Sequence, residues 1–280
     1  MKNLFKKKEK KQENIYLSAA HGIMLKKQFG QHFLRNQAVI DHMLEQVTLT
    51  ADSSVFEIGC GDGFLTKSIL QTSLARLWVF EIDPEWATYV SKTYADPRMT
   101  MYKENILDVD FARFDQYKPW TLLANLPYQV TFPILHKLQQ HRNILAEGVI
   151  MVQEEVAQKI VQVYGRGYGF PSLFFQHFFH WRLLDKVLPN SFYPPPKVDS
   201  RLIYFKPRQE LDAIPLEPEF WKFIKRCFLR PRKTLKNNLQ SYHYNLSLVS
   251  QEQLALRAQQ LNKQDLLNLW NTILAATSNR

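Results

Sequence analysis

Short apolar runs alternate with amphipathic stretches through the first two thirds of the chain. The runs typical of buried strands occupy residues 54–58, 77–81, 99–102, 121–124 and 149–152. Between them, apolar residues recur at the spacing of a helix face, in a stretch that ends at Leu70 and in stretches over 85–94, 132–139 and 155–163. Such alternation is typical of a doubly wound, mostly parallel sheet, so the pattern predicts an α/β fold of the Rossmann-like type.

The pattern changes after residue 187. A run of three prolines, Pro194 to Pro196, introduces a last β-rich segment at residues 198–205, which could pair at the sheet edge. From residue 209 the apolar positions recur only at helical spacing, as far as Ile273. We therefore expect an α/β domain over residues 26–208 and a small all-helical domain over residues 209–280.

Charge and composition point to a polyanionic partner. The chain has a formal net charge of +10 and a pI near 9.5, which favours RNA, DNA or an anionic membrane surface. No stretch approaches the ~20 apolar residues that span a bilayer, so we expect no membrane association and a place in the cytoplasm. Cys60 and Cys227 lie far apart, without the spacing of metal ligands, and we expect no metal site.

The N-terminal residues have a composition of their own. A Lys-rich run at residues 6–11 has no apolar segment behind it, unlike a secretory signal. Charge runs of this kind are usually solvated, so we predict a basic, disordered tail over residues 1–25. A dedicated RNA-binding arm is the alternative.

A glycine-rich turn follows the first predicted strand and opens a helix. The turn, Gly59-x-Gly61-x-Gly63, lets the backbone approach a ligand closely, and Glu81, at the end of the second strand, can accept both hydroxyls of a ribose. A dinucleotide site would require Gly-x-Gly-x-x-Gly, and here the third glycine comes one residue early. Because the preceding Glu57 would repel phosphates and suit a sulfonium cation, S-adenosylmethionine is the favoured cofactor.

A second motif, Asn125-Leu126-Pro127-Tyr128, follows the fourth strand at the ligand-binding edge of such a sheet. An aryl amine is a poor nucleophile, and acceptors for its two N–H groups free its lone pair. The Asn125 oxygen and the Leu126 carbonyl are suitable acceptors, and Pro127 stiffens that carbonyl's direction. Tyr128 offers a ring face on which a base can stack, worth ~1–3 kcal/mol. The motif thus predicts methylation of a planar amine, although alone it is also compatible with a simple turn.

Several further runs occur in the same order as in one known family. They are residues 27–34 (Lys-Gln-Phe-Gly-Gln-His-Phe-Leu), 153–157 (Gln-Glu-Glu-Val-Ala), 192–200 (Phe-Tyr-Pro-Pro-Pro-Lys-Val-Asp-Ser) and 232–239 (Arg-Lys-Thr-Leu-Lys-Asn-Asn-Leu). With the two motifs above, the chain from about Lys26 onward resembles the ribosomal RNA adenine N6-dimethyltransferases. The resemblance implies the sheet of a class I S-adenosylmethionine methyltransferase followed by a small helical domain.

The resemblance also implies roles for individual residues. His32 and Leu34 would lie on a segment that closes over the methyl donor, and Gly59 would lie beneath it. Asn105 would neighbour the adenine ring of the donor, although the family usually has Asp there. Phe192 would cover the target base opposite Tyr128, which gives an aromatic clamp for an adenosine flipped out of its stack.

Substrate choice depends on the basic residues and on details of the motifs. Basic side chains concentrate in the predicted helical domain, where Arg230, Arg232, Lys233 and Lys236 are the expected RNA contacts. By the resemblance, Leu126 favours the housekeeping enzyme, which dimethylates two adjacent adenosines near the 3′ end of 16S rRNA in the immature small subunit. The alternatives are a 23S rRNA methyltransferase that confers macrolide resistance, and a non-catalytic RNA-binding assembly or transcription factor. Nothing in the sequence indicates an oligomer, and we expect a monomer.

Overall fold

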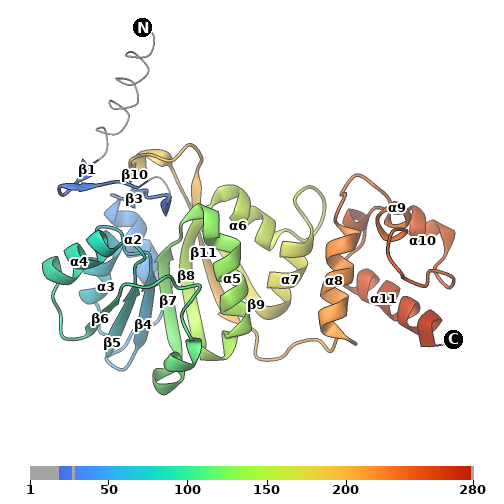
Figure 1. Ribbon diagram of the computed structural model, residues 1–280, viewed down its shortest axis with the longest axis horizontal. Helices are drawn as coiled ribbons and strands as arrows, with labels where there is room; N and C mark the ends of the chain where they lie inside the picture. The colour runs from blue at the N-terminus through green and yellow to red at the C-terminus, as the bar shows by residue number, and fades with distance from the viewer. Residues whose placement is uncertain (1–18, 27–28, 279–280) are drawn as a thin grey trace, which may run out of the picture. The chain divides into compact units, whose positions relative to one another are not determined.

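A seven-stranded sheet forms the centre of the computed structural model, which describes residues 19–26 and 29–278. Its order is β6-β5-β4-β7-β8-β11-β9, from left to right in Figure 1. The strands are β4 (Ser54–Ile58), β5 (Arg76–Phe80), β6 (Met99–Tyr102), β7 (Trp120–Asn125), β8 (Leu145–Gln153), β9 (Phe179–Val187) and β11 (Ser200–Pro207). The first five in this spatial order pair in parallel, which confirms the expected mostly parallel α/β sheet.

Helices connect and flank these strands. They are α2 (Gln37–Glu45), α3 (Phe64–Leu70), α4 (Pro84–Thr93), α5 (Thr131–Gln140), α6 (Glu154–Val161) and α7 (Phe170–Phe178). Short 3-10 helices occur at η2 (Phe111–Tyr117), η3 (Tyr128–Val130), η4 (Arg142–Ile144), η5 (Pro189–Ser191) and η6 (Ala258–Gln260). All five residues of β4 are buried, as expected for a parallel strand covered on both faces. Within the described residues, no helix has both the length and the hydropathy to cross a membrane.

Strand register brings three segments to one edge of the sheet. Ile58 pairs with Phe80 between β4 and β5, and Glu57 pairs with Leu123 between β4 and β7. Because the strands are parallel, the residues that follow them leave the sheet side by side. The glycine turn, Glu81 and Asn125 therefore meet at the same edge.

Two short strand pairs lie outside the seven-stranded sheet. β1 (Ala19–Ala20) and β2 (Ile23–Met24) are joined by His21 and Gly22, whose φ angles of 53° and 77° suit a tight two-residue turn. The disordered tail predicted over residues 1–25 is thus wrong for residues 19–24, where this turn closes a hairpin. Its first eighteen residues lie outside the described residues. β3 (Phe33–Leu34) pairs with β10 (Phe192–Tyr193) although the two are far apart in the sequence.

The chain divides into two compact units. Unit 1 contains residues 1–154 and 184–204, and unit 2 contains residues 155–183 and 205–280. Unit 2 holds most of α6, together with α7, α8 (Glu217–Cys227), α9 (Leu235–Leu239), α10 (Gln251–Ala255) and α11 (Lys263–Ser278). These units are defined by contacts within the chain and not by independent folding. The predicted boundary between an α/β domain and a helical domain after residue 208 therefore stays a prediction.

Candidate active site

A cavity of about 320 Å³ opens at the edge of the sheet where β4, β5 and β7 end, and all of its lining residues belong to unit 1. Its walls come from the segment at residues 29–34, the glycine turn, the ends of β5 and β6, and residues 125–130. Every expected donor-binding residue lines it: His32, Leu34, Gly59, Glu81, Asn105 and Asn125. Leu126, Pro127 and Tyr128 do so as well, so the structure gathers both sequence motifs around one space.

The glycine turn forms the floor of this cavity. Gly59 and Gly61 have φ angles of 74° and 54°, in the region that side chains other than glycine rarely adopt. The Gly59 amide donates to the Phe80 carbonyl at 2.8 Å, which fixes the turn to the end of β5. A Cβ on Gly61 would lie 2.7 Å from the Phe33 ring, so only a residue without a side chain fits there.

Glu81 is buried directly after β5, with 5% of its surface exposed. One carboxylate oxygen accepts the Gly61 amide at 3.1 Å, and the other accepts the Asp83 amide at 2.8 Å. Burial raises the pKa of Glu81, and these two backbone donors counteract the effect. The carboxylate is thereby held in one orientation, with lone pairs remaining for the hydroxyls of a ligand.

Glu57 is also buried, with 1% of its surface exposed, and accepts a hydrogen bond from the Thr66 hydroxyl at 2.6 Å. Burial raises its pKa to about 8. At neutral pH the carboxyl is therefore mainly protonated, and the negative charge that the sequence suggested for this position is largely absent. A cation that enters the cavity would lower the pKa again and favour the anion.

Asn125, the last residue of β7, connects the end of this strand to the segment above the cavity. Its side-chain nitrogen donates to the His32 carbonyl at 3.1 Å, so the two ends of the amide are distinguished. The next peptide is held by a bond from the Leu126 amide to the Met151 carbonyl at 3.1 Å. These two contacts fix the Asn125 side chain and the Leu126 backbone, the two groups that would accept hydrogen bonds from an amine.

Tyr128 begins η3 and presents a partly exposed ring to the cavity. Its hydroxyl lies 2.5 Å from the Ser200 hydroxyl, and burial raises its pKa, so the phenol stays neutral at physiological pH. The His32 ring stacks beside it, with the ring centroids 6.0 Å apart and the planes inclined by 24°. The His32 imidazole is in turn held by a bond from Nδ1 to the Pro194 carbonyl at 2.8 Å.

Phe192 is one expected site residue that does not line the cavity. It is 5% exposed and packs in the hydrophobic core, where β10 pairs it with Leu34 of β3. The ring found beside Tyr128 is that of His32, a contact that no sequence signal indicates. The role of Phe192 as the second wall of a base pocket stays a prediction.

Asn105 lines the cavity after β6 with its side chain already engaged. Its oxygen accepts the Leu107 amide at 3.1 Å, and its nitrogen donates to the Asp108 carboxylate at 3.1 Å. An Asp at this position would accept the same backbone bond but would repel Asp108. The Asn therefore suits its local surroundings.

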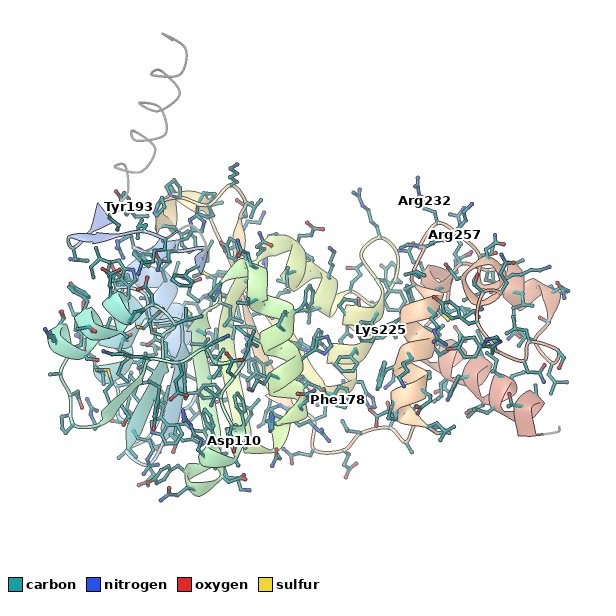
Figure 2. All side chains as sticks on the ribbon, in the orientation of Figure 1. Asp110, Phe178, Tyr193, Lys225, Arg232 and Arg257 are labelled. Atoms are coloured by element: carbon teal, nitrogen blue, oxygen red, sulfur yellow. The ribbon has the colours of Figure 1, made fainter. Side chains whose placement is uncertain are left out.

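The four basic residues expected to contact RNA all belong to unit 2, and all are exposed: Arg230, Arg232, Lys233 and Lys236. Figure 2 shows the Arg232 side chain pointing away from the ribbon into solvent. Among the described residues, no group of three or more His, Cys, Asp or Glu side chains is arranged to hold a metal ion.

Comparisons with known proteins identify the family of the chain. Residues 22–274 match the family model described as ribosomal RNA adenine dimethylase. Relatives named ribosomal RNA small subunit methyltransferase A include that of Chlorobium phaeobacteroides, 34% identical, with 90% of this chain and 92% of the relative covered. That of Thermotoga neapolitana is 35% identical, with the same coverage of 90% and 92%.

Solved structures show the same fold. A dimethyladenosine transferase from Plasmodium falciparum superposes with a TM-score of 0.73 and 23% identity, over 88% of this chain and 98% of that one. The 23S rRNA methyltransferase ErmE superposes with a TM-score of 0.64 and 22% identity, over 88% and 99%. With most of its length matched by the family model and by relatives more than 30% identical, the chain belongs to the ribosomal RNA adenine dimethylase family.

Proposed function

We propose that this protein transfers methyl groups from S-adenosylmethionine to the N6 amino groups of two adjacent adenosines near the 3′ end of 16S rRNA, and that each adenosine receives two. The observation that carries the proposal is the Asn125 amide. It lies in the same cavity as Glu81 and the glycine turn, and its nitrogen is bound to the His32 carbonyl. Its oxygen is therefore the end available to accept an amine N–H.

The residues around the cavity fit the methyl donor. Gly59 and Gly61 leave backbone exposed where a Cβ would fill the floor, and the buried Glu81 carboxylate can accept ribose hydroxyls. Asn105 lines the part of the cavity that follows β6, where an adenine ring would lie. When bound, S-adenosylmethionine supplies an electrophilic methyl group, and its positive charge would draw the Glu57 carboxyl toward the anionic form.

The chain's own residues would activate the amine by position. The Asn125 oxygen and the Leu126 carbonyl accept its two N–H groups, which favours a pyramidal nitrogen with its lone pair directed at the methyl carbon. The Tyr128 ring stacks on the base and favours the positive charge that develops on nitrogen. The alkylated nitrogen loses its proton readily to water, so the site needs no strong general base.

The choice of rRNA rests on relatives named for the small ribosomal subunit. The exposed basic side chains of unit 2 would bind phosphates and position the RNA without specifying its sequence. We place the reaction in the cytoplasm, on immature small subunits, with the protein acting as a monomer. The intact site around Asn125, Tyr128, Gly59 and Glu81 favours an enzyme over a non-catalytic assembly or transcription factor.

Labelled S-adenosylmethionine, incubated with the protein and with immature small or large subunits, tests the proposal when modified positions are mapped by primer extension. We expect paired stops near the 3′ end of the small-subunit RNA. Stops confined to the large-subunit RNA would support the macrolide-resistance alternative and overturn the proposed substrate. RNA binding without any incorporated label would overturn the enzyme assignment.

A further inference from the structure

Asp83, two residues beyond Glu81, has a completely buried side chain with more bonds than a helix cap requires. Its carboxylate accepts the Glu85 amide at 3.1 Å, which caps α4 in the ordinary way. It also accepts the Lys26 ammonium at 2.7 Å and the Gln31 side-chain nitrogen at 3.0 Å. Asp83 thus binds both Lys26 and Gln31, and Gln31 belongs to the segment that forms one wall of the cavity.

The Lys26 end of this arrangement is reinforced. The Lys26 backbone amide donates to the Gln31 side-chain oxygen at 2.8 Å, and the ammonium also pairs with Glu85 at 2.5 Å. The hydrogen bonds that Lys26 donates to Asp83 and Glu85 raise the pKa of Lys26, so its ammonium is charged at neutral pH. Lys26 is only partly exposed and Asp83 is buried, so solvent screens this pair less than an exposed one.

Residues 29–34, which we call the roof, all line the cavity. Among other contacts with unit 1, the roof pairs with β10 through Phe33 and Leu34, and the Phe33 ring meets the Trp86 ring edge-on at 4.8 Å. The backbone carbonyl of His32, in the roof, accepts a hydrogen bond from the side-chain nitrogen of Asn125. Displacement of the roof would therefore open the cavity and release the side chain proposed to orient the amine.

Asp83 also connects the roof to the ribose-binding carboxylate. Its backbone amide donates to Glu81 at 2.8 Å, on the carboxylate oxygen opposite the one that Gly61 holds. From this geometry we infer that Asp83 is a positioning residue: through Lys26 and Gln31 it latches the roof over the methyl-donor cavity and so sets the affinity for the donor. The inference rests on the proposed function only in identifying the donor as S-adenosylmethionine.

The alternative is that Asp83 merely caps α4. Asn and Asp are equivalent caps, so Asp83→Asn preserves the cap while removing the charge that binds Lys26. Lys26→Met removes the cation from a residue outside the helix. Lys92→Met, an exposed change on α4 with the same loss of charge, is the matched control.

The test measures the dissociation constant of S-adenosylhomocysteine by calorimetry and amide hydrogen exchange of residues 29–34 in the ligand-free protein. Loss of a charged hydrogen bond should weaken binding about tenfold in Asp83→Asn and in Lys26→Met. The double variant should be no weaker than the single ones, because both changes break the same latch. Roof amides should exchange faster in all three variants and remain unchanged in Lys92→Met.

Unchanged affinity and exchange in Asp83→Asn and Lys26→Met would overturn the latch and leave Asp83 as a helix cap. If the unaltered protein fails to bind S-adenosylhomocysteine at all, the proposed function is at fault. Amide exchange of the roof then still decides whether the latch exists, since it needs no ligand.

Discussion

The carbonyl oxygen of His32 lies 3.1 Å from the side-chain nitrogen of Asn125 and accepts its hydrogen bond. This contact joins the roof of the cavity to the end of β7, a central strand. The two residues belong to different sequence motifs. Because the nitrogen is engaged, the oxygen is the end of the amide left to accept an N–H of the proposed amine, so a bond to a residue outside the motif orients Asn125.

Replacement of Asn125 should separate catalysis from donor binding. In Asn125→Ala the amine loses one acceptor, so we expect methyl transfer to become undetectable, while the dissociation constant for S-adenosylhomocysteine changes little. Asn125→Asp retains an acceptor but cannot donate to the His32 carbonyl, and it should keep only a small fraction of the turnover. Single-turnover transfer to immature small subunits, together with calorimetry, measures both quantities. Near-normal turnover in Asn125→Ala would show that the amine is activated in another way.

The Tyr128 ring and its hydroxyl should make separable contributions. Tyr128→Phe keeps the stacking face and loses only the bond to Ser200, so we expect a modest decrease in kcat/KM for RNA. Tyr128→Ala removes the face and should cost ~1–3 kcal/mol, about five- to 150-fold in kcat/KM. Steady-state kinetics with RNA as the varied substrate distinguishes them. Equal losses in both variants would mean that the hydroxyl, and not the stacking, is what matters.

The sequence was most informative about the parallel core. β4 and β6 begin and end at the predicted residues. β4 is buried throughout, as expected for a central parallel strand covered on both faces, whereas β6 lies at the sheet edge and is only partly buried. α7 and β9 escaped prediction because one Phe-rich stretch, residues 170–179, passes from helix to strand without any change in its polarity. β3 and β10 have two residues each, too short for any periodicity, and they pair only through the tertiary fold.

The candidate site divides in the same way. Motifs located Glu81, the glycine turn and Asn125, since the ends of neighbouring parallel strands must meet. The stacking of His32 beside Tyr128 and the bonds of Lys26 to Asp83 could not be anticipated, because they join segments far apart in the sequence. The burial of Phe192 likewise depends on its pairing with Leu34.

Gly61 should tolerate no side chain. In Gly61→Ala the new Cβ would lie 2.7 Å from the Phe33 ring of the roof, at a φ of 54°. Gly165→Ala is a matched control, with a φ of 75° but no atom within 4 Å of the new Cβ. Both pay roughly 1–2 kcal/mol for a left-handed conformation, but only Gly61→Ala should displace the roof and weaken S-adenosylhomocysteine binding. Calorimetry and urea unfolding of the two variants provide the comparison, and unaltered donor affinity in Gly61→Ala would contradict the close packing of turn and roof.

The pKa of Glu57 makes stability depend on pH in a definite direction. Burial raises this pKa to about 8, whereas the unfolded carboxyl titrates near its ordinary value of 4.5. Between these two values the folded protein binds the extra proton, so the contribution of Glu57 to the free energy of unfolding falls as pH rises and is lost above about pH 8.

Glu57→Gln removes this titration while keeping an oxygen to accept the Thr66 hydroxyl. The variant should match the unaltered protein near pH 5 and become progressively more stable than it up to pH 9, by a few kcal/mol at most. Urea unfolding at a series of pH values measures the difference, with the exposed Glu252→Gln as a control that should show no such trend. Parallel stability curves for Glu57→Gln and the unaltered protein would mean that Glu57 is already ionised in the folded state. Binding of the donor's sulfonium would then require no loss of a proton from Glu57.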